Sequence, residues 1–224
     1  AYSSGQGLRM EDEGWHALPL DTPKEKSAPQ TKALDPLFHL PAKRMPKPQG
    51  TVRPSSLGGE HALPGEGRAP DEAMSFGSLV HLLLEKLPGL PPSLWPEAAA
   101  QLASGFDPAA LAPALEEAQR TIQSPTLSQY FTQGLVEVPI SATLPELGRV
   151  FGKIDRLIVA ADHVLAIDYK TNSVVPASES EVPEGLLRQM AAYPAALSAV
   201  YPEKRIETAF IWTSSTTFMP LSEH

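Results

Sequence analysis

Residues 150–170, VFGKIDRLIVAADHVLAIDYK, decide the fold of this chain. Two apolar, β-branched runs, 150–159 and 164–169, flank a short turn-compatible segment, which predicts two consecutive buried strands. An acidic residue interrupts each run, Asp155 in the first and Asp168 near the end of the second. Burying a carboxylate in a strand is costly unless it is paired, hydrogen-bonded or bound to a cation, so both positions need a chemical explanation.

The flanking sequence predicts further strands and helices around this stretch. Residues 135–140 also alternate with period two, so we expect a meander of three strands. A helix is expected from Pro183 to about Tyr201, and a final strand over 206–213. Upstream we expect a largely buried helix from an N-cap at Asp71 to Leu87, then a helical insert of two Ala-, Leu-, Glu- and Gln-rich helices, 95–104 and 108–122. The order of elements predicts an α/β fold.

The N-terminal third has a different composition. Residues 1–70 hold ten of the 24 prolines and have no sustained apolar periodicity, so we expect an extended or disordered linker followed by one domain over 71–224. The chain begins with Ala1 rather than Met, which favours a fragment of a longer protein. Within the linker, four basic residues and no acid between Asp35 and Glu60 give a local charge of +4, which fits either a solvated segment or a DNA or partner contact.

The overall composition excludes several classes of site. The net charge of −8 repels nucleic acid, so binding DNA would require local positive charge. The chain has no cysteine, which excludes disulfides, thiolate zinc sites and iron–sulfur clusters and fits a reducing cytoplasm. No apolar run approaches the ~20 residues that span a bilayer, so we expect a soluble, cytoplasmic protein without a membrane partner.

The acidic residues of the two strands, together with a lysine, predict a metal-assisted reaction. Period two places Asp168 and Lys170 on one face of their strand, with Tyr169 on the other. With Asp155 from the adjacent strand, two carboxylates form a hard oxygen site suited to Mg²⁺. A bound metal lowers the pKa of a water, and a lysine can orient that water and offset charge on a phosphate. These residues predict phosphodiester hydrolysis, although an Asp and a Lys two apart on a strand also form ordinary ion pairs.

Four short motifs occur in order along the chain: Gly77-Ser78-Leu79-Val80-His81, Gly152-Lys153-Ile154-Asp155-Arg156, Ile167-Asp168-Tyr169-Lys170-Thr171 and Gln189-Met190-Ala191-Ala192-Tyr193. Together they resemble the motifs of RecB-family nucleases of the PD-(D/E)XK superfamily. The resemblance covers about residues 71–213, with residues 53–58 similar to the lead-in, and is closest to the C-terminal nuclease domains of bacterial AddA subunits. It implies a restriction-endonuclease-like core, a central mixed β-sheet flanked by helices.

The resemblance also implies roles for individual residues. The catalytic residues would be Asp155, Asp168 and Lys170. The metal ligands would be His81, Asp155, Asp168 and the backbone carbonyl of Tyr169, and Gln189 and Tyr193 would lie beside the DNA. Taken alone, His81 could be a core histidine, and Gln189 with Tyr193 could serve helix packing. One departure is Pro194, which forfeits a helical hydrogen bond and is expected to kink the helix beside Tyr193.

Cofactors and partners follow from the same resemblance. The metal would be Mg²⁺, with Mn²⁺ as a substitute, and the lack of cysteine favours AddA over relatives with an iron–sulfur cluster. The partners would be DNA, as a single strand fed from a duplex end, and an AddB-like subunit, in an ATP-dependent helicase–nuclease that processes double-strand breaks for recombinational repair. The chain has no Gly-x-x-x-x-Gly-Lys-Ser/Thr loop, so ATP would be used only by a helicase part outside it.

Two other hypotheses stay open. The chain could be a catalytically inactive nuclease-like module that binds DNA ends or docks a partner subunit. It could also be an unrelated α/β domain with a chance Asp-x-Lys sequence.

Overall fold

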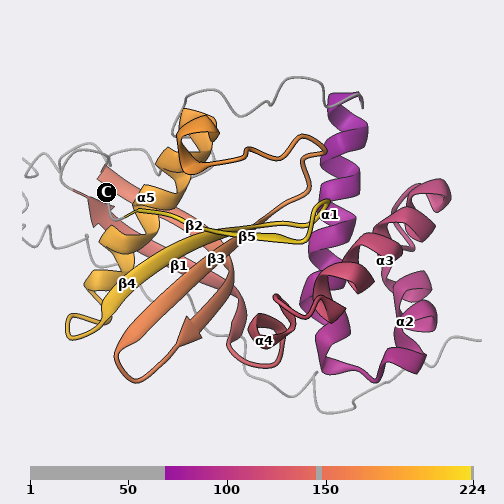
Figure 1. Ribbon diagram of the computed structural model, residues 1–224, viewed down its shortest axis with the longest axis horizontal. Coiled ribbons are helices and arrows are strands. Elements are labelled where there is room, and N and C mark those ends of the chain that lie inside the picture. Colours follow the sequence, from indigo (N-terminus) through magenta and orange to yellow (C-terminus); the bar gives the residue numbers. More distant parts are fainter. Residues whose placement is uncertain (1–68, 145–147, 223–224) are drawn as a thin grey trace, which may run out of the picture. The chain divides into compact units, whose positions relative to one another are not determined.

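The computed structural model of the protein describes residues 69–144 and 148–222. The predicted linker lies outside the described residues except for Ala69 and Pro70, as does its basic cluster, so both stay predictions. In the described part, the predicted order of helix, helical insert, three strands, helix and strand is confirmed, with one more strand at the end (Figure 1).

The described helices begin with a long one that is followed by the insert. The α-helices are α1 (Pro70–Lys86), α2 (Trp95–Leu102), α3 (Pro108–Gln123), α4 (Ser128–Phe131) and α5 (Glu184–Ser198). Three short 3-10 helices are η4 (Leu87–Gly89), η5 (Pro92–Leu94) and η6 (Glu179–Glu181). The described helices include none long and apolar enough to cross a membrane.

The first helix starts earlier than its sequence predicts. Ala69 is the N-cap and Pro70 the first helical residue, so the predicted cap at Asp71 is wrong. Proline suits this position because its φ is already helical and its missing N–H would have no partner there. Asp71 instead lies in the first turn, where its charge complements the helix dipole.

The strands form one mixed sheet in the order β1-β2-β3-β4-β5. Their bounds are β1 (Leu135–Leu144), β2 (Gly148–Val159), β3 (His163–Lys170), β4 (Arg205–Trp212) and β5 (Thr217–Pro220). The first three are an antiparallel meander, as predicted, whereas β4 runs parallel to β3 after the crossover through α5, and β5 pairs antiparallel with β4. The predicted α/β fold with a central mixed sheet and flanking helices is confirmed.

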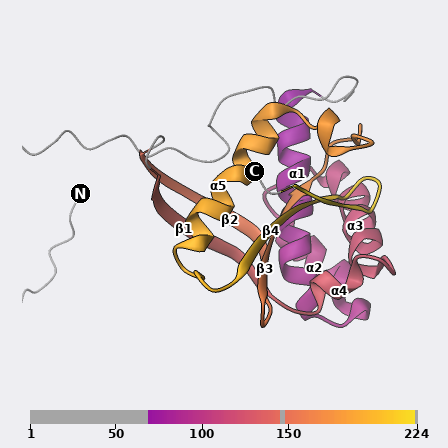
Figure 2. The same cartoon turned by 60° about the vertical axis from the view of Figure 1, so that its left-hand side comes forward.

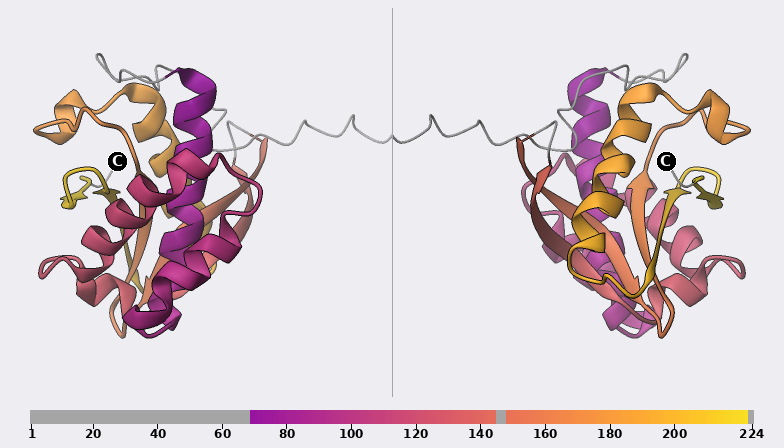
Figure 3. Two further views of the ribbon diagram at one scale, coloured as in Figure 1. Left: turned by 90° about the vertical axis from the view of Figure 1, so that its right-hand side faces the viewer. Right: turned by 90° about the vertical axis from the view of Figure 1, so that its left-hand side faces the viewer.

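Each face of the sheet is covered by different helices (Figure 3). The apolar residues of α1 and the insert pack with Ile167, Tyr169 and Ile211 on one face. The apolar side of α5 packs with Ala166, Phe210 and other residues on the opposite face. Successive residues of β3 therefore point into different layers, and its C-terminal end lies between α1 and α5.

The feature that positions the site is a fork between β2 and β3. These strands pair only over residues 156–159 and 164–167, whereas β2 pairs with β1 along almost its whole length. The β1–β2 pairing is interrupted at Glu137, whose φ is +51°, opposite Asp155. Beyond this point the β1–β2 hairpin diverges from the rest of the sheet (Figure 2). Asp155 and Asp168 are thus the first residues past the paired segment.

Candidate active site

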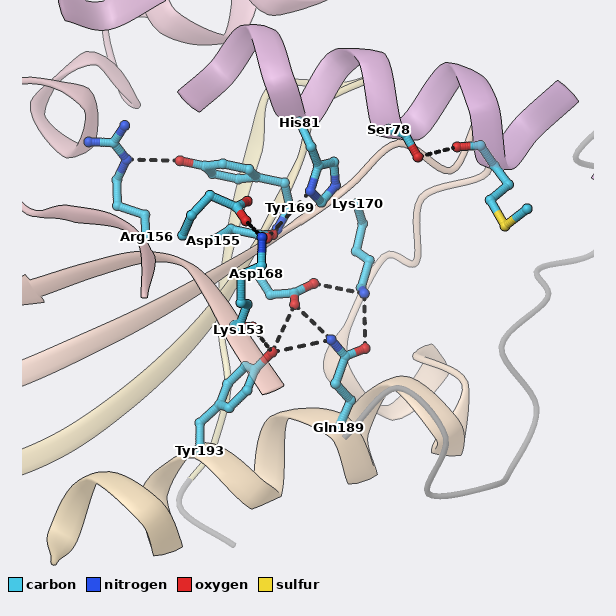
Figure 4. Close-up of polar contacts among 12 residues, drawn as sticks. Ser78, His81, Lys153, Asp155, Arg156, Asp168, Tyr169, Lys170, Gln189 and Tyr193 are labelled. Atoms are coloured by element: carbon cyan, nitrogen blue, oxygen red, sulfur yellow. Dashed lines mark hydrogen bonds and ion pairs between the residues drawn. The ribbon is translucent and has the colours of Figure 1, made fainter. Parts of the chain in front are cut away.

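Asp155 lies in the fork and is held from two sides (Figure 4). Its Oδ2 accepts a hydrogen bond of 2.7 Å from the backbone N–H of Tyr169, on β3. Its Oδ1 lies 3.4 Å from Nδ1 of His81, which projects from α1. Asp155, predicted to be buried, is half-buried, and it has the partners that a carboxylate in an apolar strand needs.

Asp168 lies across the fork and is buried, with 3% of its surface exposed. Its Oδ2 is 2.7 Å from Nζ of Lys170, which places both side chains on one face as predicted. Its Oδ1 accepts hydrogen bonds from Nε2 of Gln189 at 2.8 Å and from the Tyr193 hydroxyl at 3.3 Å. Helix α5 therefore supplies the donors that line the far side of the carboxylate.

Gln189 and Tyr193 project from successive turns of α5 toward the fork (Figure 4). Oε1 of Gln189 accepts a hydrogen bond of 3.2 Å from Lys170, so one amide bridges both ends of the Asp168–Lys170 ion pair. The Tyr193 hydroxyl also lies 3.0 Å from the Lys153 carbonyl on β2. Burial raises the pKa of Tyr193 far above its ordinary value, so this hydroxyl stays neutral. Helix α5 continues through Pro194 to Ser198, so the proline does not keep Tyr193 from the site.

The approach of α1 to the end of β3 depends on Gly77. A Cβ at this position would lie 2.9 Å from Oγ1 of Thr171, the residue after Lys170. Real Cβ atoms essentially never come this close, so glycine permits the contact. His81 follows one turn later on the same helix and reaches Asp155 from there.

Arg156 acts on the site through Tyr169, a role that the sequence analysis did not assign. Its Nε donates a hydrogen bond of 2.8 Å to the Tyr169 hydroxyl, and an NH group donates to the Gln133 carbonyl at 3.0 Å. The guanidinium also lies 5.0 Å from the ring centre of Phe131. Fixing Tyr169 in this way fixes the backbone N–H that holds Asp155. The sequence signal for this role was Arg156 itself, a charged residue directly after Asp155 in an otherwise apolar strand.

A second buried cluster, also missed from sequence, meets the site at Lys170. We call Glu117, Thr121 and Thr213 the insert network. Oγ1 of Thr213 lies 2.5 Å from Oε1 of Glu117 and 3.1 Å from the Lys170 carbonyl, which also accepts from the Thr213 N–H. Oγ1 of Thr121 donates to the Glu117 carbonyl at 2.8 Å. The network ties α3 of the insert to the strand end that carries Lys170.

The two carboxylates have opposite electrostatic environments. Burial raises the pKa of Asp168, and the nearby Asp155 charge raises it further against the opposing effect of Lys170. Burial would also raise the pKa of Asp155, but His81, the Tyr169 N–H and Lys170 lower it below its ordinary value. Burial by itself lowers the pKa of His81, but the Asp155 carboxylate more than offsets this and the pKa is raised. Such divergence between neighbouring acids is typical of functional sites.

The donor set fits a hard divalent cation, although its side chains are engaged with one another. Among residues 69–144 and 148–222, no group of three or more His, Asp or Glu side chains is placed to hold a metal ion. The contacts explain this, because Asp168 is turned to Lys170 and Gln189 while Asp155 contacts His81. Oδ2 of Asp168 is nevertheless buried, and it has no hydrogen bond apart from its ion pair with Lys170. Two carboxylates and an imidazole are donors that Mg²⁺ or Mn²⁺ accept.

The structure therefore brings together all six side chains that the sequence singled out: His81, Asp155, Asp168, Lys170, Gln189 and Tyr193 (Figure 4). Tyr169 contributes its N–H and hydroxyl to the surrounding contacts, and the predicted role of its carbonyl stays a prediction.

Comparison with known proteins places the chain in a family. No curated protein matches it. A solved structure titled "Crystal structure of SSO0001" is similar at 14% sequence identity, with 66% of this chain and 68% of that chain covered and a TM-score of 0.30, too loose a superposition to bear on function. Residues 57–217, more than half of the chain, match the family model described as PD-(D/E)XK nuclease superfamily. The chain belongs to the PD-(D/E)XK nuclease superfamily.

Proposed function

We propose that this chain is a Mg²⁺-dependent deoxyribonuclease domain that hydrolyses phosphodiester bonds in DNA, as an exonuclease or an endonuclease. The observation that carries the proposal is the meeting of Asp155, Asp168 and Lys170 where β2 and β3 diverge. Two carboxylates with opposite pKa shifts, Asp168 buried and Asp155 half-buried, and a lysine have no evident structural use at a strand end. They do match what metal-assisted phosphodiester hydrolysis requires.

The metal would be held by Asp155 and Asp168, with His81 and the Tyr169 carbonyl as further ligands. When bound, Mg²⁺ would polarise the phosphate and lower the pKa of a coordinated water. Lys170 would orient the attacking water and stabilise the negative charge that builds on the phosphate. Its ammonium suits this role because it is a compact charge on a flexible stem with a second acceptor, Gln189, within reach.

Gln189 and Tyr193 would border the DNA strand and also position the catalytic residues. The Gln189 amide uses both ends on Asp168 and Lys170, so it sets the distance between them. Tyr193 ties α5 to the Lys153 carbonyl and thereby to β2. Because the Tyr193 hydroxyl also donates to Asp168 on β3, Tyr193 connects the two arms of the fork.

The finer assignment concerns the larger protein complex to which the domain belongs. We propose an AddA-like role within a cytoplasmic, ATP-dependent helicase–nuclease that processes double-strand breaks for recombinational repair. The support is the order of the four sequence motifs and the identity of their residues. An AddB-like subunit would be its partner, ATP would be used by a helicase part, and the DNA would arrive as a single strand.

A second candidate is a catalytically inactive module that binds DNA ends or docks a partner subunit. One observation favours it: in the described part of the chain, no set of acidic and histidine side chains is placed to hold a metal ion. The presence of both acids and the lysine in one cluster favours the active enzyme instead.

Cleavage of end-labelled single-stranded DNA by the chain in Mg²⁺ tests the proposal, beside an EDTA control and Lys170→Ala. We expect cleavage that requires both metal and Lys170, with a loss of roughly a hundredfold to a thousandfold in the variant. Metal binding is measured separately by calorimetry with Mn²⁺. Cleavage retained in Lys170→Ala would contradict the role of the lysine, and absence of both cleavage and metal binding would favour the inactive module.

A further inference from the structure

The β1–β2 hairpin carries one exposed face beyond the fork. In β2, the exposed residues Arg149, Phe151 and Lys153 alternate with residues 150, 152 and 154, of which Val150 and Ile154 are fully buried. Their cross-strand partners are Thr143, Ser141 and Pro139, which are exposed as well. The α5 side of the hairpin is packed in the core, and the opposite side is open.

This face combines positive charge with an exposed aromatic ring. Phe151 is 45% exposed, and it is the most exposed aromatic side chain in residues 69–144 and 148–222. Arg149 and Lys153 flank it at intervals of two residues, about 13 Å apart along the strand. None of the six cross-strand residues of the face is acidic. On a chain with net charge −8, this is a local surface suited to an anion.

The face leads into the candidate active site. Lys153 precedes Asp155 by two residues and lines an open groove of about 500 Å³ together with His81 and Glu137. Lys153 forms an ion pair with Glu137, and the lysine side chain remains 60% exposed. Exposed ion pairs of this kind contribute little stability, so a phosphate could replace the carboxylate at small cost. At Lys153 the exposed stripe therefore meets a groove that reaches His81, the partner of Asp155.

We propose that this hairpin face, defined by Arg149, Phe151 and Lys153, is a platform for single-stranded DNA that guides the strand to Asp155. The inference rests on the proposed nuclease function and adds a substrate contact outside the site itself. Phe151 stacks on an unpaired base, and the two cations contact the phosphates on either side. Alternating cationic and aromatic contacts are the mode by which proteins bind single strands without reading sequence.

A single strand fits this face better than a duplex. In a duplex the bases are stacked on one another, so the ring of Phe151 would find no free base face, whereas in a single strand each base has one. The charge of the face also favours a polyanion over a protein partner without acidic residues, because two cations flank the ring.

The test measures binding without cleavage, so its outcome does not depend on the nuclease reaction. Anisotropy of a fluorescein-labelled oligothymidylate of about 20 nucleotides is followed in EDTA with the full chain. We expect Phe151→Leu to weaken binding between about fivefold and a hundredfold and Phe151→Trp to retain it, because stacking needs an aromatic ring. Arg149→Ala with Lys153→Ala should lower the salt dependence, the slope of log K against log salt, by about 1.4.

Matched controls lie away from the face. Leu94→Ala removes an exposed apolar side chain next to α2, and Arg205→Ala removes an exposed cation at the opposite end of β3 and β4. Both should bind like the unaltered chain, and thermal melting checks that every variant is folded. If Phe151→Leu bound the oligonucleotide as tightly as Leu94→Ala does, the platform would be overturned. If Phe151→Leu weakened binding to blunt duplex DNA by the same factor as binding to the single strand, the preference for a single strand would be overturned. A chain that binds DNA through this face but neither cuts DNA nor binds Mn²⁺ would support the platform and contradict the nuclease function.

Discussion

Lys170 takes part in two buried polar clusters that are built differently. Its side chain joins the active-site cluster with Asp168 and Gln189, and its carbonyl joins the insert network through Thr213. In the insert network, no buried side-chain atom lacks a hydrogen bond, whereas in the active-site cluster Oδ2 of Asp168 is held only by its ion pair with Lys170. The insert network holds one acid, and the active-site cluster holds two, of which Asp155 raises the pKa of Asp168.

The difference separates a structural cluster from a functional one. Buried polar groups that are fully satisfied rigidify a fold, and a buried charge without complete compensation costs stability and persists where function requires it. The insert network should therefore matter mainly for stability and the active-site cluster mainly for reaction rate. Substitutions in each cluster test this distinction.

The largest effect is expected for Asp168→Asn in the active-site cluster. We expect DNA cleavage to fall about a thousandfold or more and Mn²⁺ binding, measured by calorimetry, to be lost, because the amide has no charge for the metal. The thermal midpoint in metal-free buffer should not fall. Burial raises the pKa of Asp168, and an acid whose pKa rises on folding weakens the fold when it is ionised at neutral pH.

Asp162→Asn is the matched control for that experiment. Asp162 lies in the turn between β2 and β3, where its side chain is 79% exposed, and the substitution should leave cleavage unchanged. If Asp168→Asn cut DNA at a rate within tenfold of that of the unaltered chain, the assignment of the active-site cluster as the functional one would be wrong.

Local patterns in the sequence predicted the elements and much of the site. Period two placed Asp168 and Lys170 on one face because side-chain direction in a strand depends only on residue number. The structure bears this out through their 2.7 Å ion pair. The end strand β5 was missed because its four residues, which follow a turn, are too few to show a period.

Tertiary features could not be predicted from the same patterns. The fork depends on where β2 leaves β3, which is a matter of register between strands and of the interrupted β1–β2 pairing at Glu137. The hydrogen bond between Glu117 and Thr213 joins residues 96 apart in the chain. The engagement of Asp168 with Gln189, which turns the carboxylate away from a metal-binding arrangement, also depends on the packing of α5. Residue spacing contains none of this information.

A smaller effect is expected for Thr213→Val in the insert network. The change removes the hydroxyl next to the Glu117 carboxylate, which is only 7% exposed, so the free energy of unfolding in urea should fall by about 2 to 3 kcal/mol. Adding Glu117→Met should recover most of this loss, because replacing both partners removes the unpaired charge. Thr132→Val, which alters an exposed threonine, is the control. A thousandfold loss of cleavage in folded Thr213→Val would make the insert network part of the catalytic machinery.

The smallest effect is expected for Gly77→Ala, where α1 crosses the end of β3 between the two clusters. The new methyl group would meet Oγ1 of Thr171 at 2.9 Å, so α1 or Thr171 must shift by a few tenths of an ångström. Alanine favours a helix over glycine by about 0.5 to 1 kcal/mol, which offsets the crowding and should leave the thermal midpoint almost unchanged. Cleavage should nevertheless fall roughly tenfold, because small displacements of catalytic groups are costly in rate. Gly105→Ala has open space around its Cβ and should alter neither quantity, and Thr171→Ala should restore cleavage to Gly77→Ala. Loss of stability with unchanged cleavage would instead show that the glycine serves helix packing, as the insert network does.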